Sequence, residues 1–193
     1  MRKEEKIVAI LRRKSFSTQV QSNPDDLGLI DTPEKLLRFA EPRGLVSIPL
    51  NVEKIADALG IGVEFLSFPS DEEDLSGKLF HDVQSGKWRI HVNAQHHPNR
   101  QRYTIAHEIA HFFLHRHLQD VFEDKIFFRG GEATKEEYQA NEFASALLMP
   151  ESAFRREIKS GKVDVEELAK FFQVSTLALR LRAKNLGMAG HGL

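Results

Sequence analysis

The stretch from Arg102 to His115 carries the pattern His-Glu-x-x-His inside a largely apolar sequence. On an α-helix, residues four apart lie on one face, about one turn (roughly 5.4 Å) from each other. His107 and His111 can therefore point their imidazoles at one ion, and Glu108 lies about 100° around the helix from His107. Two histidines and a glutamate in a buried helix are costly unless something satisfies them, and a metal ion would do so. The stretch favours a zinc site with Glu108 as general base over histidines that are merely hydrogen-bonded.

Composition limits the ligands and partners that such a site can have. The chain has 193 residues, a formal net charge of -1 and no cysteine. A metal must therefore use histidine and carboxylate, and disulfides are excluded. The balanced charge gives no overall field for nucleic acid, and no run reaches the about 18 apolar residues that cross a bilayer. Because Glu4 and Glu5 also argue against a signal peptide, we expect a soluble cytoplasmic protein that does not bind membranes.

The character of the sequence changes twice along the chain and predicts three parts. Residues 1–44 are expected to be an accessory helical segment, with one helix near 4–13 and another that begins at Thr32, an N-cap that proline follows. Residues 45–150 are expected to form the main domain, and residues 151–193 a C-terminal helical subdomain.

The main domain is predicted to be α+β. A helix capped by Asn51 precedes a strand at 61–66, and the segments 78–83 and 87–92 flank a turn at 84–86. The second arm of this hairpin alternates apolar and polar residues, which is typical of a strand with one buried face. We expect a small antiparallel sheet packed on a helix that carries the His-Glu-x-x-His pattern. That helix is predicted over 98–118, and a second long helix over 134–148.

A third ligand is needed, because a catalytic zinc usually has three protein ligands and leaves its fourth position to water. His117 has the position of the third histidine in the pattern H-E-x-x-H-x-x-G-x-x-H, but that pattern needs glycine where this chain has Leu114. On a straight helix His117 would lie about 15 Å along the axis from His107, which is out of reach. Glu137, on the second long helix, is the better candidate. We expect the remaining nearby histidines to be solvated or to lie next to the ligands: His96, His97, His115 and His117.

Other interpretations of the second helix remain open. Thr134-x-x-Glu137 also fits a capping box, in which the carboxylate would bond the start of its own helix. Glu136 and Glu142 are alternative carboxylates, each about 100° from Glu137 around the helix. Asn141, one turn after Glu137, is in a position to accept from the N–H of a ligand imidazole and so to fix its tautomer.

Two blocks occur in a characteristic order. The first is Pro98-x-Arg100-x-Arg102-Tyr103-Thr104-x-Ala106-His107-Glu108-x-x-His111-x-x-Leu114-His115, and the second is Glu137-x-x-Ala140-Asn141-x-Phe143-Ala144-x-x-Leu147-Leu148-Met149-Pro150. Together with the Ser76-Gly77 entry to the hairpin and a strand that ends in Asn93, they resemble the ImmA/IrrE metallopeptidases. The resemblance covers about residues 45–150, extends weakly to residue 187, and is far more specific than His-Glu-x-x-His alone.

The resemblance implies a zincin-like metalloprotease domain. It implies Zn2+ on His107, His111 and Glu137, with Glu108 as the catalytic acid and base. It also implies a protein partner, a helix-turn-helix repressor or antitoxin that the enzyme cuts or inactivates, which relieves transcriptional repression. The chain has no recognisable N-terminal repressor-type DNA-binding domain, so residues 1–44 leave the choice of partner open.

The C-terminal part predicts two short helices within 163–187, with the spacing of a helix-turn-helix-like hairpin. From Leu168 onward the bases Lys170, Arg180, Arg182 and Lys184 meet no acid. A DNA-reading helix would need such charge. A packed hairpin with a solvated basic face is the favoured interpretation.

Peptide-bond hydrolysis is the leading functional hypothesis, with Glu108 carrying a proton from water to the leaving amine. The hairpin arm at 88–93 is expected to pair with an extended substrate by strand addition. The sequence does not determine which side chain would stabilise the oxyanion, and four side chains are candidates. Two rival functions remain: a regulator of the same fold that binds a repressor or DNA without cutting, and a helical domain in which the pattern is accidental. The oxyanion candidates are Tyr103, Tyr138, His81 and His91.

Overall fold

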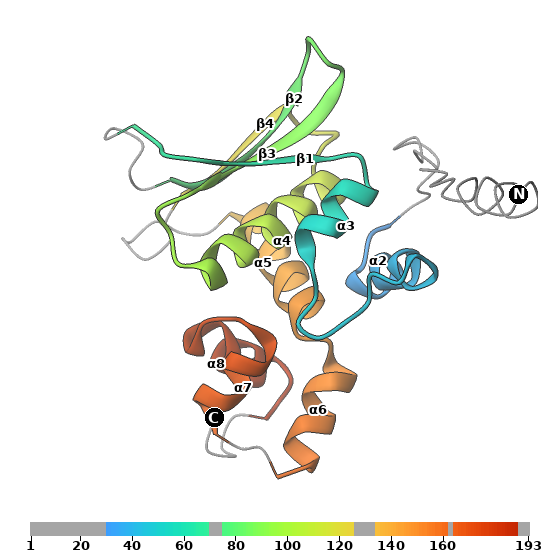
Figure 1. The fold of residues 1–193 in the computed structure, drawn as a ribbon, viewed down its shortest axis with the longest axis vertical. Helices are drawn as coiled ribbons and strands as arrows, with labels where there is room; N and C mark the ends of the chain where they lie inside the picture. The colour runs from blue at the N-terminus through green and yellow to red at the C-terminus, as the bar shows by residue number, and fades with distance from the viewer. Residues whose placement is uncertain (1–29, 70–74, 126–133, 162–163, 189–193) are drawn as a thin grey trace, which may run out of the picture.

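Helices lie along one side of a four-stranded sheet. A computed structural model describes residues 30–69, 75–125, 134–161 and 164–188. Figure 1 shows α4 and α5 beneath the sheet and α6 to α8 at the far end of the molecule. The predicted α+β class is confirmed. The elements are α2 (Pro33–Ala40), a 3-10 turn (Glu41–Arg43), α3 (Val52–Ala58), β1 (Gly62–Leu66), β2 (Leu75–Asp82), β3 (Lys87–Asn93), α4 (Pro98–Leu114), β4 (Val121–Lys125), α5 (Lys135–Leu148), α6 (Glu151–Lys159), α7 (Val165–Phe172) and α8 (Thr176–Asn185).

Side-chain caps explain where the first helices begin. The Thr32 hydroxyl accepts from the backbone N–H of Lys35 at 3.3 Å, and Asn51 accepts from the backbone N–H of Lys54 at 2.9 Å. Each cap satisfies an N–H group that a helix start leaves unpaired, and contributes about 1 kcal/mol. These two predicted helix starts are confirmed, whereas the helix predicted near 4–13 lies outside the described residues.

The sheet has the strand order β1-β3-β2-β4 and is mixed. β3 pairs antiparallel with β2, as the predicted hairpin requires, but it pairs parallel with β1. The expectation of a purely antiparallel sheet is therefore wrong. Alternation along a strand predicts its two faces and says nothing about the direction of a neighbour that lies far away in the sequence. β4 pairs antiparallel with β2 and was not among the predicted strands. It is only 5 residues long, and only its first two residues are apolar, so it shows no alternating pattern.

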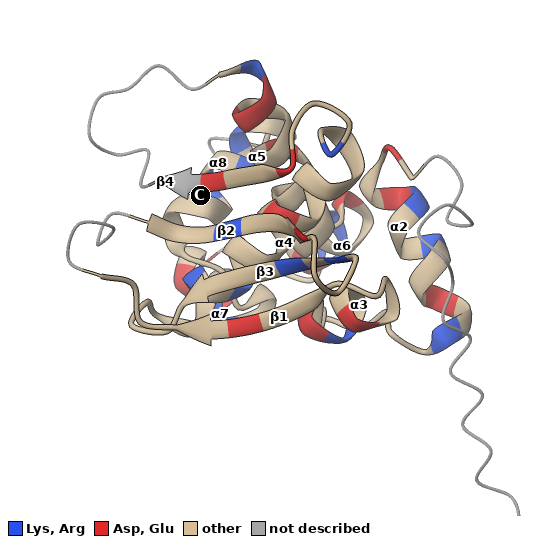
Figure 2. Ribbon diagram, turned by 90° about the horizontal axis from the view of Figure 1, so that it is seen from above, with Lys and Arg blue, Asp and Glu red and all other residues tan. Residues whose placement is uncertain are grey.

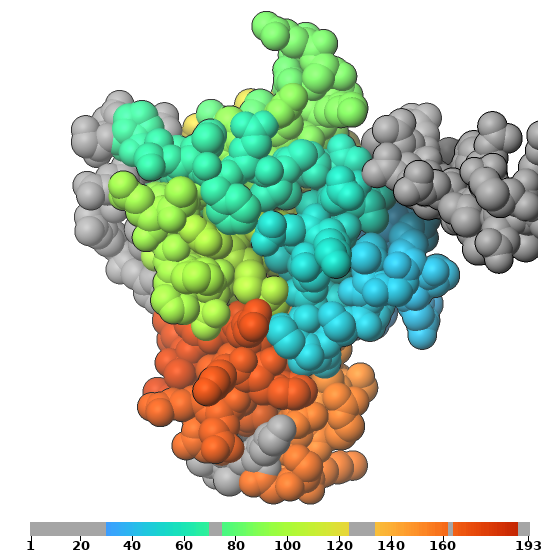
Figure 3. All heavy atoms as spheres, viewed as in Figure 1, coloured from blue at the N-terminus to red at the C-terminus, as the bar shows by residue number. Residues whose placement is uncertain are grey.

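The turn between β2 and β3 is organised by the side chain of Asp82. Its carboxylate accepts from the backbone N–H of Gln84 at 3.1 Å and from the Ser85 hydroxyl at 2.6 Å, which confirms the predicted turn. The end of the hairpin projects above the body of the molecule (Figure 3). Its tip presents Val83, which is 85% exposed.

The buried core is centred on α4. Three of its side chains, Ile105, Ile109 and Phe112, are fully buried with Leu79 of β2 and Ile90 of β3. Burying a side chain of this size contributes about 1.5–3 kcal/mol. α5 packs along α4 from the other side, so the helix with the His-Glu-x-x-His pattern lies between the sheet and α5. α4 ends at Leu114, short of the predicted end near residue 118.

The C-terminal helices form a packed hairpin. Gln173 joins α7 to α8 in the left-handed region, with φ 52°. Arg182 is 8% exposed and donates from Nε to the Met149 carbonyl at 3.1 Å. One of the bases that would have favoured a DNA-reading face is thus buried, while Arg180 and Lys184 are exposed.

Side chains from all three predicted parts meet in one core, in which Leu36 of α2 and Phe172 of α7 join the residues around α4. The division at residues 44 and 150 stays a prediction. Seen from above, acidic and basic residues are interspersed over the described elements (Figure 2). Of the helices that the structure describes, none combines the length and the apolar character needed to cross a membrane.

Candidate metal centre

Three side chains from two helices meet between α4 and α5. The Nε2 atoms of His107 and His111 lie 3.0 Å apart. One carboxylate oxygen of Glu137 lies 3.2 Å from His107 Nε2, and the other lies 3.2 Å from His111 Nε2. Helix spacing brings the two imidazoles together, and the packing of α5 on α4 brings the carboxylate to them. Among the described residues, these three form the cluster that could hold a metal ion.

The donor set and its dimensions fit a zinc ion. Two imidazoles and one carboxylate are a familiar set of protein ligands for catalytic zinc, and they leave one position open. Around a tetrahedral zinc with bonds of about 2.0–2.1 Å, two ligand atoms lie roughly 3.3 Å apart. The separations of 3.0 and 3.2 Å in this structure are close to that value.

The electrostatics of the cluster favour metal-binding protonation states. Burial works to raise the pKa of Glu137, but the hydrogen bonds and charges of His107 and His111 outweigh it and bring the pKa to about 2. Desolvation lowers the pKa of His111, although the hydrogen bond to Glu137 acts in the opposite direction. The two directions favour an ionised carboxylate on Glu137 and a free lone pair on the His111 imidazole. A metal ligand needs both states.

Glu108 lies next to His107 on α4 and is fully buried. Strand β2 passes close to it at Gly77, where an added Cβ would lie 2.3 Å from Thr104 Cγ2 and 3.5 Å from Glu108 Oε1. A side chain at this position would collide with α4, so glycine is what allows β2 to approach the helix. In the sequence, Gly77 stands out only as part of the family resemblance. The predicted strand begins at residue 78, and only the observed start of β2 at Leu75 places this glycine inside a strand.

The other carboxylates on α5 have different partners. Thr134 caps α5 by accepting from the backbone N–H of Glu137 at 3.3 Å, so half of the predicted capping box is formed. The carboxylate of Glu137 points to the histidines instead. The pKa of Glu136 is lowered first by a hydrogen bond from its own backbone N–H and then by one from the Thr134 hydroxyl, so this carboxylate lies at the start of its own helix. Glu142 accepts from Asn185 of α8, away from the cluster.

The remaining histidines near α4 occupy two different settings. His117, the alternative third ligand, lies exposed beyond the end of α4 and outside the cluster. His115 is 3% exposed, and its Nδ1 lies 3.0 Å from Nδ1 of His111. The ring of Phe122, from β4, stacks on His111 with 4.9 Å between centroids and 27° between planes. The imidazole of His111 is therefore held on several sides.

Asn141 contacts Tyr103 in this structure. The Tyr103 hydroxyl lies 3.3 Å from Asn141 Oδ1 and 3.2 Å from the Asn141 carbonyl, and it can donate to either. The role of Asn141 in orienting a ligand imidazole stays a prediction. Among the described hydrogen bonds, Nδ1 of His111 is paired with Nδ1 of His115 and not with Asn141.

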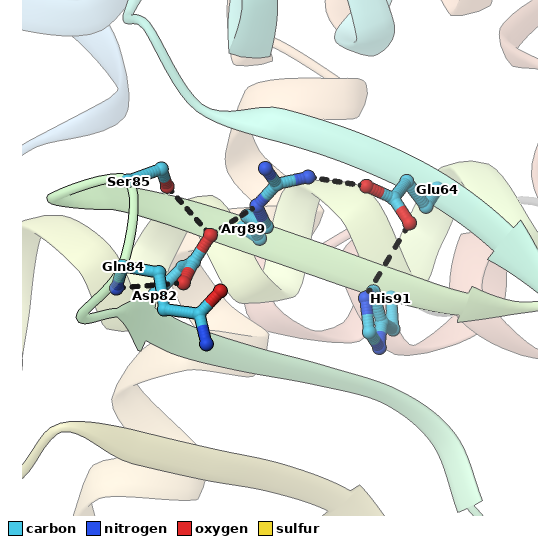
Figure 4. Close-up of polar contacts among 6 residues, drawn as sticks. All are labelled: Glu64, Asp82, Gln84, Ser85, Arg89 and His91. Atoms are coloured by element: carbon cyan, nitrogen blue, oxygen red, sulfur yellow. Dashed lines mark hydrogen bonds and ion pairs between the residues drawn. The ribbon is translucent and has the colours of Figure 1, made fainter.

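Strand β3 cannot accept a substrate by strand addition, so that expectation for residues 88–93 is wrong. β1 and β2 already occupy its two edges. The edges of the described sheet belong to β1 and β4. His91 points to the outer face of the sheet, where it meets Glu64 and Phe80, because the buried Ile90 and Val92 take the helix side (Figure 4). It is therefore removed from the candidates for stabilising an oxyanion at the cluster.

Comparisons with known proteins agree with the resemblance seen in the sequence. Residues 56–184 match the model of the Peptidase M78 family, described as the IrrE N-terminal-like domain. The chain is also 27% identical over 148 residues to the metallopeptidase ImmA of Bacillus subtilis (strain 168), and the match covers 71% of this chain and 77% of that protein. The family match includes both blocks around α4 and α5. This chain therefore belongs to the peptidase family of the IrrE N-terminal-like domain.

Proposed function

We propose that the chain is a zinc-dependent endopeptidase in which His107, His111 and Glu137 hold the ion and Glu108 is the general acid and base. The observation that carries the proposal is the meeting of two imidazoles and one carboxylate, with closest contacts of 3.0–3.2 Å between each pair of side chains. The fully buried Glu108 follows one of these histidines directly in the sequence. Membership of a peptidase family and the similarity to a metallopeptidase support it. When bound, a zinc ion would polarise a peptide carbonyl and make water more acidic.

Glu108 is the proposed carrier of the proton, because it is a buried carboxylate next to a ligand residue on α4. It follows His107 directly on α4 and is not one of the three residues of the described cluster. In peptide hydrolysis a carbon–oxygen bond forms, the carbon–nitrogen bond breaks, and one proton moves from water to the leaving amine. A carboxylate within hydrogen-bond reach of both groups accepts that proton and then donates it. Burial of Glu108 keeps other solvent away during the transfer.

The proposed substrate is a folded protein. More specifically, we propose a helix-turn-helix repressor or antitoxin in the cytoplasm. Cleavage of such a partner would relieve transcriptional repression. The support for this substrate is the ImmA/IrrE resemblance of the blocks around α4 and α5. A non-catalytic regulator that binds the same partner without cutting it is the competing function.

The test is to incubate the purified protein with the repressor-type protein encoded beside its gene, with and without a chelator. Discrete fragments that disappear with the chelator are expected. Glu108→Gln should still bind about one zinc by elemental analysis, and its cleavage rate should fall about 10²–10⁴-fold because the proton carrier is lost. Glu166→Gln removes the same charge from an exposed position on α7 and is the matched control. A stable uncut complex would instead assign the protein as a binding module.

A further inference from the structure

A line of hydrogen bonds leads from His111 away from the cluster. His111 Nδ1 lies 3.0 Å from His115 Nδ1, and His115 Nε2 lies 3.2 Å from Gln139 Oε1. His115 is one turn after His111, at the end of α4, and Gln139 follows Glu137 on α5. The two helices that supply the three donor atoms are thus joined a second time, outside the cluster.

The donor and acceptor roles along this line can be assigned from one requirement. A neutral imidazole has one N–H and one nitrogen with a free lone pair. His111 Nε2 faces His107 and Glu137, so its lone pair must be free if it is to bind a cation. The proton of His111 then lies on Nδ1 and is donated to His115 Nδ1. His115 must in turn carry its own proton on Nε2, which donates to Gln139 Oε1.

We propose that His115 and Gln139 are positioning residues that hold His111 in the tautomer whose Nε2 lone pair faces the metal centre. The inference rests on the proposed zinc site. With this assignment, each of the two hydrogen bonds along the line has one donor and one acceptor. The opposite direction would require the amide nitrogen of Gln139 to donate, and it would leave a proton on His111 Nε2, where the ion should bind.

The surroundings of His111 explain why the tautomer needs support. Its ring already contacts His107 and is stacked by Phe122, so the orientation of the plane is restricted from two sides. The stacking of Phe122 does not distinguish a proton on Nδ1 from one on Nε2. His115 does, and the exposed Gln139 holds His115 in the matching form. Such partners of ligand imidazoles typically contribute about 10–100-fold to metal affinity.

Gln139 offers the cleaner experiment because it is exposed on α5, where a substitution leaves the core intact. Zinc affinity is measured by competition with a chelator for the wild type, Gln139→Glu, Gln139→Leu and the control Lys135→Leu. Leucine can neither donate nor accept, so Gln139→Leu should bind zinc about 10-fold more weakly. The carboxylate of Gln139→Glu can only accept, so it should match or exceed the wild type. Lys135→Leu changes an exposed residue one turn earlier on α5 and should equal the wild type.

The tautomer itself is read from long-range ¹H–¹⁵N spectra of the zinc-loaded protein. His115 should carry its proton on Nε2 and have a bare Nδ1. His115→Phe, which removes the whole relay, should weaken zinc binding by up to about 100-fold. A proton on His115 Nδ1, or an unchanged affinity in Gln139→Leu, would overturn the inference while the zinc site stands. If the wild type binds no zinc at all, both this inference and the proposed function fail.

Discussion

Two clusters of histidine and carboxylate lie on opposite sides of the same sheet and differ in chemistry. On the helix side, the side chains of His107 and His111 are each 2% exposed, and their neighbour Glu137 is 17% exposed. The carboxylate there has two imidazoles as its partners in the described contacts. Its charge therefore remains available for a cation.

On the outer side, an arginine lies among the acids. Arg89 donates to Glu64 and to Asp82, while His91 lies 3.7 Å from Glu64 (Figure 4). These side chains are 22–43% exposed, so solvent screens their charges. Proximity of histidine and carboxylate alone therefore does not predict a metal centre. Burial away from a neighbouring arginine favours one, because the charge of the acid is then left to an ion.

The largest difference between the two clusters should appear when one carboxylate is neutralised in each. Glu137→Gln removes a donor oxygen and the charge from the inner cluster, so zinc affinity should fall by more than about 100-fold, the upper end of the cost of losing a supporting residue. Glu64→Gln, the matched change on the outer face, should leave zinc affinity unchanged. Competition with a chelator measures both. Equal losses in the two variants would mean that the clusters are not distinct.

Zinc should stabilise the folded chain through the inner cluster. A ligand at about 100 times its dissociation constant adds about 2.7 kcal/mol to the free energy of unfolding, because it binds only the folded state. Urea denaturation with zinc and with a chelator measures this difference. Magnesium, which prefers an octahedron of oxygen ligands, is the control ion and should have little effect. Equal stabilisation of Glu137→Gln by zinc would show that the ion binds elsewhere.

Close packing of the sheet on α4 can be tested at Gly77. A methyl group there would lie 2.3 Å from Thr104 Cγ2 and 3.0 Å from the His91 carbonyl, so Gly77→Ala should reduce the free energy of unfolding by about 1–3 kcal/mol. Gly62→Ala, on β1, is the control, because its methyl group would make an ordinary contact at 3.7 Å from Arg89 Cγ. Thermal or urea unfolding compares the two. A smaller loss in Gly77→Ala than in Gly62→Ala would contradict the close approach.

The smallest effect is expected in the outer cluster. Arg89→Met keeps much of the side-chain length but removes the charge shared by Glu64 and Asp82. Exposed ion pairs of this kind contribute about 0.2–1 kcal/mol, and salt screens them. The loss of unfolding free energy should therefore shrink in high salt, and zinc affinity should not change. A large loss that is independent of salt would place Arg89 among the structural residues of the core.

Prediction from the sequence succeeded where geometry is local. The caps at Thr32 and Asn51 need only residues within one helical turn, and the turn after Asp82 needs only the next three residues. It failed for the parallel neighbour of β3 and for β4, both of which depend on contacts between distant segments. The end of α4 was expected four residues too late, because an apolar pattern does not show where a helix stops.

The sequence by itself determined that His107, Glu108 and His111 would lie together, because helical spacing sets their positions before any tertiary contact forms. It also excluded thiolate ligands, since the chain has no cysteine. Only the tertiary structure decided which carboxylate reached the histidines. The packing of α5 on α4 turns Glu137 toward them and leaves Glu136 and Glu142 with other partners. That choice depends on how two apolar helix faces fit each other, and no local pattern contains it.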